Sequence, residues 1–375
     1  MKNIQLLLIS ILVLGFSQSR LTGQSTTHDS TTNKIQIAFL LDVSGSMSGL
    51  IAQAQAQLWT IVNFLSHLQK DGQKPSIEFA VITYGNAGLA EKGHIDVVAP
   101  FSTDLDLISD KLFLLSVSGG NEYCGQALQT GLDSLKWSAD TSHLRMIVIA
   151  GNEPFDQGEC NYIPVCDTLA RRGLYLNTVY CGGIDEGISF QWENAAIIGQ
   201  GEYLNIEQDL EIAQIETPYD GKIIDLYQQY KATYLFFGPD HEEKRLRYQN
   251  QDHNAYQISN AFYRDRIIYK IQNDQIFDPW DLIDQFDQNS NILDSLDREL
   301  LPEHLKILSP KELRRPCIQN QYKRQIITEA IQIYADKVKE FLAVSQKGKE
   351  EGKTLDDVLK YVIRKQAIVK GYKGL

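Results

Sequence analysis

An apolar run that ends directly in an acidic, hydroxyl-rich turn constrains the fold of this chain more than any other stretch. Residues 35–41 are almost entirely apolar, which is typical of a buried parallel strand. After Leu50, apolar side chains recur at helical spacing, which predicts a helix. The turn 42–49 therefore joins a strand to a helix, at the edge of the sheet where open α/β folds place their ligand sites.

This turn offers oxygen ligands at alternating positions. Asp42 supplies a carboxylate, and Ser44 and Ser46 supply hydroxyls. Oxygen ligands alone suit a hard divalent cation, so we expect Mg²⁺, or Mn²⁺ or Ca²⁺ in its place. The alternative is a serine-rich turn that only caps the following helix through Ser48.

The rest of the first half alternates between apolar strands and amphipathic helices. This pattern predicts a doubly wound, mostly parallel sheet of the α/β class. A connection is expected over 211–225, and a mainly α-helical region over 220–375. The further predicted strands are 76–84, 95–99, 146–150, 174–181 and 199–206, and the further predicted helices are 105–115, 126–135 and 163–172.

The Asp-x-Ser-x-Ser pattern after the first strand, with Gly45, Met47 and Gly49 around it, resembles the metal-ion-dependent adhesion site (MIDAS) of von Willebrand factor A domains, also called integrin I-like domains. The segments 120–125, 150–155 and 177–182 look similar to those of an exported bacterial subgroup of unknown function. The resemblance covers residues 35 to about 210, and it implies a Rossmann-like fold and a bound cation.

The resemblance also implies ligands from two further loops, usually a threonine and an aspartate. This chain departs from the family at both places, because Glu122 and Asn152 stand there. The expected metal ligands are therefore Asp42, Ser44, Ser46, Glu122 and Asn152. If Glu122 binds directly, the cation is better neutralised and attracts an external carboxylate less strongly. The alternatives are a solvated loop acid for Glu122 and a turn residue for Asn152.

Length and charge bound the organisation of the chain. Its 375 residues favour two domains, and we place a von Willebrand factor A-like domain at 34–215 and the helical region at 220–375. The net charge of −12 argues against nucleic acid as a partner. The charge is uneven, because residues 301–375 carry 16 Lys and Arg against 9 Asp and Glu.

The N-terminus predicts export. A basic start, an apolar stretch over 4–16 and small residues after it match a secretory signal peptide at 1–23, followed by a flexible lead-in at 24–33. A membrane anchor is the alternative, but the apolar stretch is shorter than the roughly 20 residues of a spanning helix. We therefore expect a periplasmic or secreted protein with no membrane span after cleavage.

Cysteine usage is consistent with export but does not require it. We expect one disulfide among Cys124, Cys160, Cys166 and Cys181, with buried thiols as the alternative, while Cys317 lies far from them in the sequence.

No catalytic constellation is evident in the sequence. Met47 occupies the position that the nucleophile serine would need, and neither a His-Glu-x-x-His zinc motif nor a phosphate-binding Lys-Ser/Thr loop is present. The leading hypothesis is a cation-dependent protein-binding module that serves as an adhesion or scaffold component of an envelope assembly. A carboxylate of a protein partner would complete the coordination of its cation. The alternatives are a metal-dependent hydrolase using the same cation and a structural envelope protein with a vestigial site.

Overall fold

The computed structural model describes residues 33–210, 215–272, 280–345 and 354–374. The predicted signal peptide (1–23) lies outside the described residues, as does the lead-in (24–33) apart from Asn33. The described residues from Asn33 onward form one compact unit. Within the described residues, no helix combines the length and the apolar character that crossing a membrane requires.

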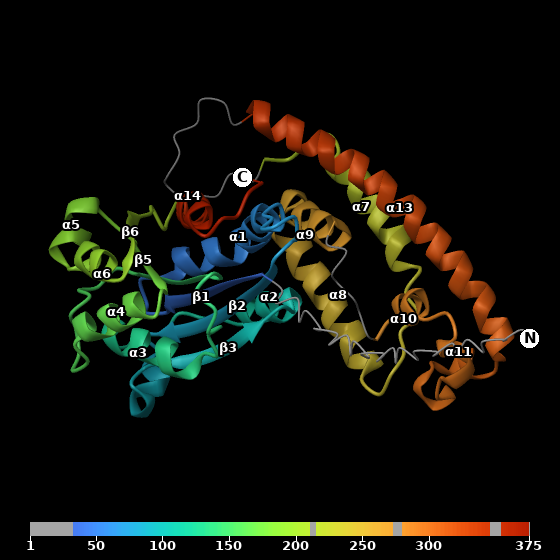
Figure 1. Ribbon diagram of the computed structural model, residues 1–375, viewed down its shortest axis with the longest axis horizontal. Helices are drawn as coiled ribbons and strands as arrows, with labels where there is room; N and C mark the ends of the chain where they lie inside the picture. The colour runs from blue at the N-terminus through green and yellow to red at the C-terminus, as the bar shows by residue number, and fades with distance from the viewer. Residues whose placement is uncertain (1–32, 211–214, 273–279, 346–353, 375) are drawn as a thin grey trace, which may run out of the picture. The chain divides into compact units, whose positions relative to one another are not determined.

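The first half of the chain forms a six-stranded sheet, drawn in Figure 1. Its strands are β1 (Lys34–Asp42), β2 (Ser76–Tyr84), β3 (Asp96–Ser102), β4 (Leu144–Gly151), β5 (Tyr175–Tyr180) and β6 (Gln200–Asn205). The strand order is β3-β2-β1-β4-β5-β6, and only β3 runs antiparallel to its neighbour. The predicted mostly parallel, doubly wound sheet is confirmed, and β1 lies at its centre.

Helices alternate with the strands in the first half, and the described chain beyond the sheet is helical. In the first half they are α1 (Ser48–Ser66), η1 (Ala87–Lys92), α2 (Leu105–Phe113), α3 (Cys124–Ser134), α4 (Tyr162–Arg171), α5 (Ile184–Ser189) and α6 (Trp192–Ile198). Beyond the sheet they are α7 (Asp220–Lys231), α8 (His241–Ile258), α9 (Asn260–Gln272), α10 (Leu282–Gln288), α11 (Ile292–Ser295), η2 (Arg298–Leu300), α12 (Glu303–Lys306), α13 (Pro310–Ser345) and α14 (Leu355–Val369). The prediction of a helical second half is confirmed, although α7 begins inside the stretch expected to be a connection.

The alternation of β1 builds two apolar layers. Ile37 and Phe39 point to the face covered by α1, whereas Ala38 and Leu40 point to the face covered by α3 and α4. All four side chains are buried. Figure 1 shows α1 and α14 on one side of the sheet and α3 and α4 on the other.

The helical half shares the apolar core of the α1 side. Trp59 of α1 packs against Tyr269 of α9, with 5.6 Å between ring centroids. The last helix, α14, returns to the sheet, where Gln366 Nε2 donates to Asn177 Oδ1 of β5 at 2.6 Å and both side chains are buried. The sheet and helices α7, α8, α9, α13 and α14 therefore share one continuous core, whereas α10–α12 and the start of α13 pack in a separate apolar cluster.

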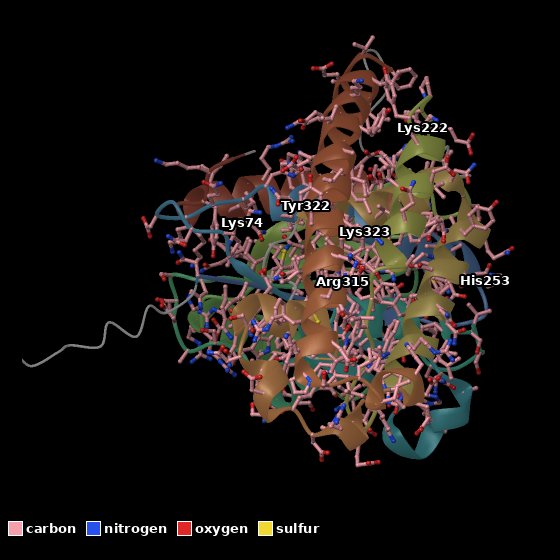
Figure 2. All side chains as sticks on the ribbon, turned by 90° about the vertical axis from the view of Figure 1, so that its right-hand side faces the viewer. Lys74, Lys222, His253, Arg315, Tyr322 and Lys323 are labelled. Atoms are coloured by element: carbon pink, nitrogen blue, oxygen red, sulfur yellow. The ribbon has the colours of Figure 1, made fainter. Side chains whose placement is uncertain are left out.

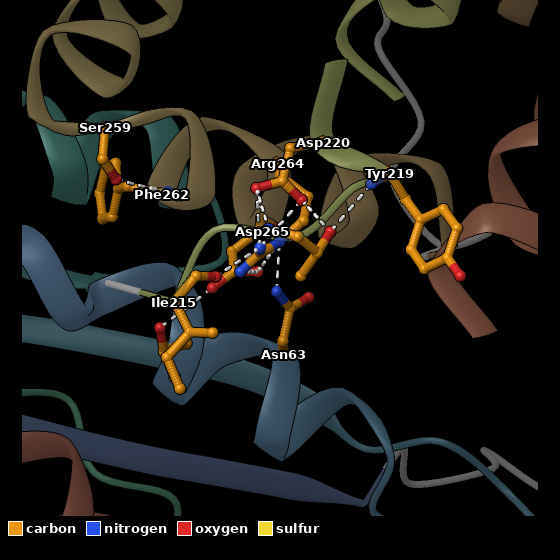
Figure 3. Close-up of polar contacts among 10 residues, drawn as sticks. Asn63, Ile215, Tyr219, Asp220, Ser259, Phe262, Arg264 and Asp265 are labelled. Atoms are coloured by element: carbon orange, nitrogen blue, oxygen red, sulfur yellow. Dashed lines mark hydrogen bonds and ion pairs between the residues drawn. The ribbon is translucent and has the colours of Figure 1, made fainter. Parts of the chain in front are cut away.

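Buried ion pairs reinforce this contact. The Arg264 guanidinium of α9 donates to both Asp220 carboxylate oxygens, at 3.0 and 3.1 Å, and pairs with Asp265 at 2.9 Å. Asn63 of α1 donates its side-chain amide to the Asp265 backbone oxygen at 2.8 Å. Figure 3 shows how this network joins α1, α7 and α9.

Candidate metal centre

Asp42 is fully buried at the end of the central strand. It pairs in register with Tyr84, the last residue of β2, so the carboxyl ends of two neighbouring strands meet beside it. Its Oδ1 accepts a hydrogen bond from the Ser44 backbone N–H at 2.7 Å, which shapes the turn. Its Oδ2 is inaccessible to solvent and has no hydrogen-bond partner among the described residues.

Two hydroxyls and an amide continue from Asp42 toward solvent. The Ser44 and Ser46 hydroxyl oxygens lie 3.4 Å apart, and Ser46 Oγ lies 3.1 Å from Asn152 Nδ2 and 3.5 Å from its Oδ1. Ser44 is buried whereas Ser46 is exposed. Asn152 follows directly on β4, so the structure brings the first and third loops together.

Glu122 comes to the same place from the second loop. This loop is fixed to the first by a hydrogen bond from the Ser118 N–H to the Val43 backbone oxygen, 2.7 Å long. Burial raises the pKa of Glu122, and the nearby Glu153 raises it further, while a hydrogen bond with the Ser44 side chain lowers it. We call Asp42, Ser44, Ser46, Glu122 and Asn152 the cation cluster. The structure brings all five together.

Glycines let the backbone approach the cluster closely. Gly85 has a left-handed φ of +81°, and a Cβ there would lie 2.8 Å from Asp42 Oδ1 and 3.3 Å from Glu122 Cγ. A Cβ on Gly151 would lie 3.1 Å from Asp42 Oδ2 and 2.4 Å from the Tyr84 hydroxyl. Side chains at these positions would displace the carboxylate, so the close approach of both loops to Asp42 requires glycine.

Two neighbours of the cation cluster, Tyr84 and Glu153, are not predicted from the sequence. Tyr84 is buried beneath Asp42 and donates its hydroxyl to the Ala150 backbone oxygen at 2.8 Å, fixing the ends of β2 and β4. Glu153 is half-buried and close enough to raise the pKa of both Asp42 and Glu122. The position of Glu153 beside Asn152 could have signalled its proximity, whereas the role of Tyr84 depends on strand register alone.

The electrostatics fit a cation. Burial, with added repulsion from Glu122 and Glu153, raises the pKa of Asp42 from 3.8 to about 7, although hydrogen bonds with Ser44 oppose the shift. A buried carboxylate beside two other acids, with one oxygen lacking a partner, is unfavourable unless a positive charge compensates it. Across the described chain, no group of three or more His, Cys, Asp and Glu side chains forms a metal site. The cation cluster instead combines two carboxylates with hydroxyls and an amide, as Mg²⁺ and Ca²⁺ prefer.

The cysteines near this edge are not bridged. All five are free thiols, so the predicted disulfide is wrong in this structure. Cys124 donates its thiol to the Tyr84 hydroxyl at 3.8 Å, and Cys166 is buried in the apolar layer of α4. Burial raises the pKa of both thiols, to about 12 for Cys166, so they are poor nucleophiles and poor metal ligands.

The family model of the von Willebrand factor type A domain matches residues 36–188. No curated protein matches the chain.

Several solved structures are similar to parts of the chain. The conserved hypothetical protein BatB from Bacteroides thetaiotaomicron is 14% identical, with a TM-score of 0.36 over 46% of this chain and 90% of that one. The SpRpn10 VWA domain is 16% identical, with a TM-score of 0.35 over 48% and 91%. Proximal thread matrix protein 1 from the mussel byssus, in a form with a zinc-occupied MIDAS motif, is 14% identical, with a TM-score of 0.35 over 46% and 42%.

Proposed function

Because residues 36–188 form a von Willebrand factor type A domain, we propose that this chain is a divalent-cation-dependent protein-binding module. The cation cluster would hold Mg²⁺, or Mn²⁺ or Ca²⁺ in its place, and an acidic group of a protein partner would complete the coordination. The observation that carries this proposal is the unpartnered, inaccessible Oδ2 of Asp42 beside the Glu122 carboxyl group. A bound cation would neutralise these acids and offer an open position to an external ligand.

The exposure of the cluster supports a partner that docks from solvent. Asp42 and Ser44 are buried, Glu122 and Asn152 are half-buried, and Ser46 is exposed, so the cluster opens toward solvent from its buried base. Without a cation, Asp42, Glu122 and Glu153 would repel an acidic partner. Partner binding should therefore depend strictly on the cation.

We further propose the division of labour between the two halves. The segment 34–215 would carry the cation site, and the helical region 220–375 would orient it within an envelope assembly. The extensive core shared by α1, α9 and α14 supports a fixed orientation, because a large apolar contact disfavours relative motion. The periplasmic or secreted location proposed for this assembly rests on the N-terminal sequence pattern.

Selection of peptides from a displayed random library, carried out in Mg²⁺ and in EDTA, tests the proposed function. We expect peptides rich in Asp and Glu to be enriched on the chain in Mg²⁺ only, and to be lost on Asp42→Ala. The matched control is Asp167→Ala, which removes an exposed acid that pairs with Arg171 on α4. Equal enrichment in EDTA, or retention by Asp42→Ala, would contradict the proposal.

A further inference from the structure

The long helix α13 carries apolar side chains on two opposite faces. One face, which includes Leu313, Ile327 and Ile331, is buried against the rest of the protein. The opposite face carries a second apolar row, Ile318, Tyr322, Ile326 and Ile333, whose side chains are 49–65% exposed. At 3.6 residues per turn these four positions fall within about 80° of the helix circumference. We call this row the outer stripe.

The outer stripe is accessible along its length. In Figure 2, α13 runs along the front of this side of the protein, with Arg315, Tyr322 and Lys323 labelled along it. Figure 1 shows α13 at the outer edge of the helical region, with α7 beneath it. A surface helix normally presents polar residues to water, so a row of large apolar side chains on its outer face indicates an interaction surface.

We propose that the outer stripe binds the outer stripe of a second copy of this chain, with the two α13 helices antiparallel about a two-fold axis. Any antiparallel pairing of two identical helices satisfies a two-fold axis, so the axis alone leaves the register open. Placing Ile318 opposite Ile333 of the second copy also places Ile333 opposite Ile318 of that copy, as a two-fold axis requires. The axis then passes between positions 325 and 326, beside Ile326.

Charge complementarity selects this register. Three residues before Ile318 is Arg315, and three residues after Ile333 is Asp336. Seven residues before Ile318 is Lys311, and seven residues after Ile333 is Glu340. In the antiparallel pair each of these basic residues therefore faces an acidic one, and each ion pair occurs twice.

These four charges are available for the pairing. All four side chains are exposed, on the same side of α13 as the outer stripe. Among the described residues, none of them forms an ion pair within the chain, and Asp336 accepts one exposed hydrogen bond, from Gln332 at 3.2 Å. In this register Ile318 faces Ile333, and exposed Glu329 lies opposite Tyr322. The opposite charges toward both ends are the feature that specifies orientation in paired helices.

Charge reversal on the full-length chain tests the proposal by sedimentation equilibrium. Arg315→Glu and Asp336→Arg each create two like-charge contacts across the axis, so each should weaken dimerisation about tenfold or more. Combining them restores opposite charges, and the double variant should dimerise within about threefold of the unmodified chain. Lys323→Glu is the matched control, because it changes the net charge as Arg315→Glu does but lies off the stripe, and it should leave dimerisation unchanged.

Cross-linking tests the register directly. In a Cys160→Ser background, which removes a partly exposed thiol, chains carrying Ile318→Cys and chains carrying Ile333→Cys are mixed and oxidised. We expect a disulfide between the two kinds of chain and none between identical chains. In a pair of identical chains, the two introduced thiols would lie about 22 Å apart along the helix.

Three outcomes would overturn the proposal. They are an unmodified chain that stays monomeric across the concentration series, a double charge reversal no better than the single ones, and cross-linking between identical chains. The contact uses no residue of the cation cluster, so EDTA should leave it unchanged. Its failure is thus distinguishable from failure of the proposed function.

Discussion

At the residue scale, the two carboxylate oxygens of Asp42 have different surroundings. Its Oδ1 is fixed by the Ser44 N–H, whereas its Oδ2 lacks a partner although it is shielded from water. Gly85 and Gly151 approach the carboxylate so closely that a side chain at either position would collide with it. A site of this kind destabilises the fold when it is empty and charged, and it gains stability when a cation binds.

The pH dependence of stability should reveal the electrostatic cost of Asp42. Its pKa is raised in the fold from 3.8 to about 7, so the folded state binds the proton more tightly. The associated stability is complete below about pH 4 and is lost as the pH rises to about 7. In EDTA, the free energy of unfolding should therefore fall relative to Asp42→Asn by as much as a few kcal/mol across this window.

Chemical denaturation at a series of pH values, with and without Mg²⁺, measures this difference. Saturating Mg²⁺ should remove the decline, because the cation replaces the proton as the partner of the carboxylate. A difference between the two proteins that stays constant with pH would show that Asp42 is not perturbed.

Glu122 should affect two affinities in opposite directions: that of the protein for the cation, and that of the bound cation for an acidic partner. Replacing Glu122 with Gln removes one negative charge near Asp42. We expect Mn²⁺ to bind more weakly, by about tenfold, and the bound Mn²⁺ to attract an acidic peptide more strongly. Titrations of Mn²⁺, and of a selected acidic peptide at saturating Mn²⁺, separate the two effects. Unchanged affinities in both titrations would make Glu122 a solvated loop acid.

At the element scale, α9 holds the helical region to the sheet through two buried arginines. Arg264 pairs with Asp220 and Asp265, and Arg266 pairs with Asp106 of α2 and lies 3.1 Å from Asp252 of α8. Arg266 also stacks over Trp59 of α1, with 5.1 Å to the ring centroid. One helix thus contacts α1, α2, α7 and α8 through charges that have little access to water.

Removal of one of these guanidinium groups should be costly. Arg264→Met would leave Asp220 buried without its cation, so we expect a loss of roughly 3–5 kcal/mol in the free energy of unfolding. Urea denaturation measures this loss. The control is Arg171→Met, in the exposed pair with Asp167, for which we expect at most about 1 kcal/mol. Equal losses for the two substitutions would contradict the expectation that the buried ion pair contributes more to stability than the exposed one.

The elements that the sequence predicts well are those governed by local pattern. The strand over 76–84 is found with the same bounds, and the helix predicted over 105–115 begins at Leu105, where Asp104 caps α2 by accepting from the Leu107 N–H. The helical region predicted from residue 220 begins where α7 does, although the connection was predicted to extend to 225. The burial of α7 depends on Ile223 and Tyr227 packing on distant helices. Long-range contacts of this kind leave no local signature.

At the scale of the whole molecule, the chain closes on itself. The last helix, α14, lies beside α1, where Gln53 and Gln57 accept hydrogen bonds from the backbone N–H groups of Leu355 and Asp356, each at 2.9 Å. Nothing in the sequence of α14 indicates that its partner lies some 300 residues earlier. The local sequence also does not predict that Glu153 and Tyr84 lie at the site, because strand order and register bring them there.

The sheet and the helices that share its apolar core should unfold together. Because the apolar cluster of α1 continues into α9, α13 and α14, we expect the slowest-exchanging amides of β1 and α9 to have the same opening free energy. Native-state hydrogen exchange measures both sets. Early opening of α9 while β1 stays protected would show instead that the helical region unfolds as a separate unit.

Calorimetric titration of Mg²⁺ and Mn²⁺ into the metal-stripped chain tests the central claim most directly. We predict saturable binding of one cation, with release of protons below about pH 7, where Asp42 is partly protonated. Asp42→Ala should abolish the binding, and Asp167→Ala should leave it intact. Absence of binding heat together with absence of thermal stabilisation at millimolar cation would contradict the account, and would leave the cation cluster as a vestige of the fold.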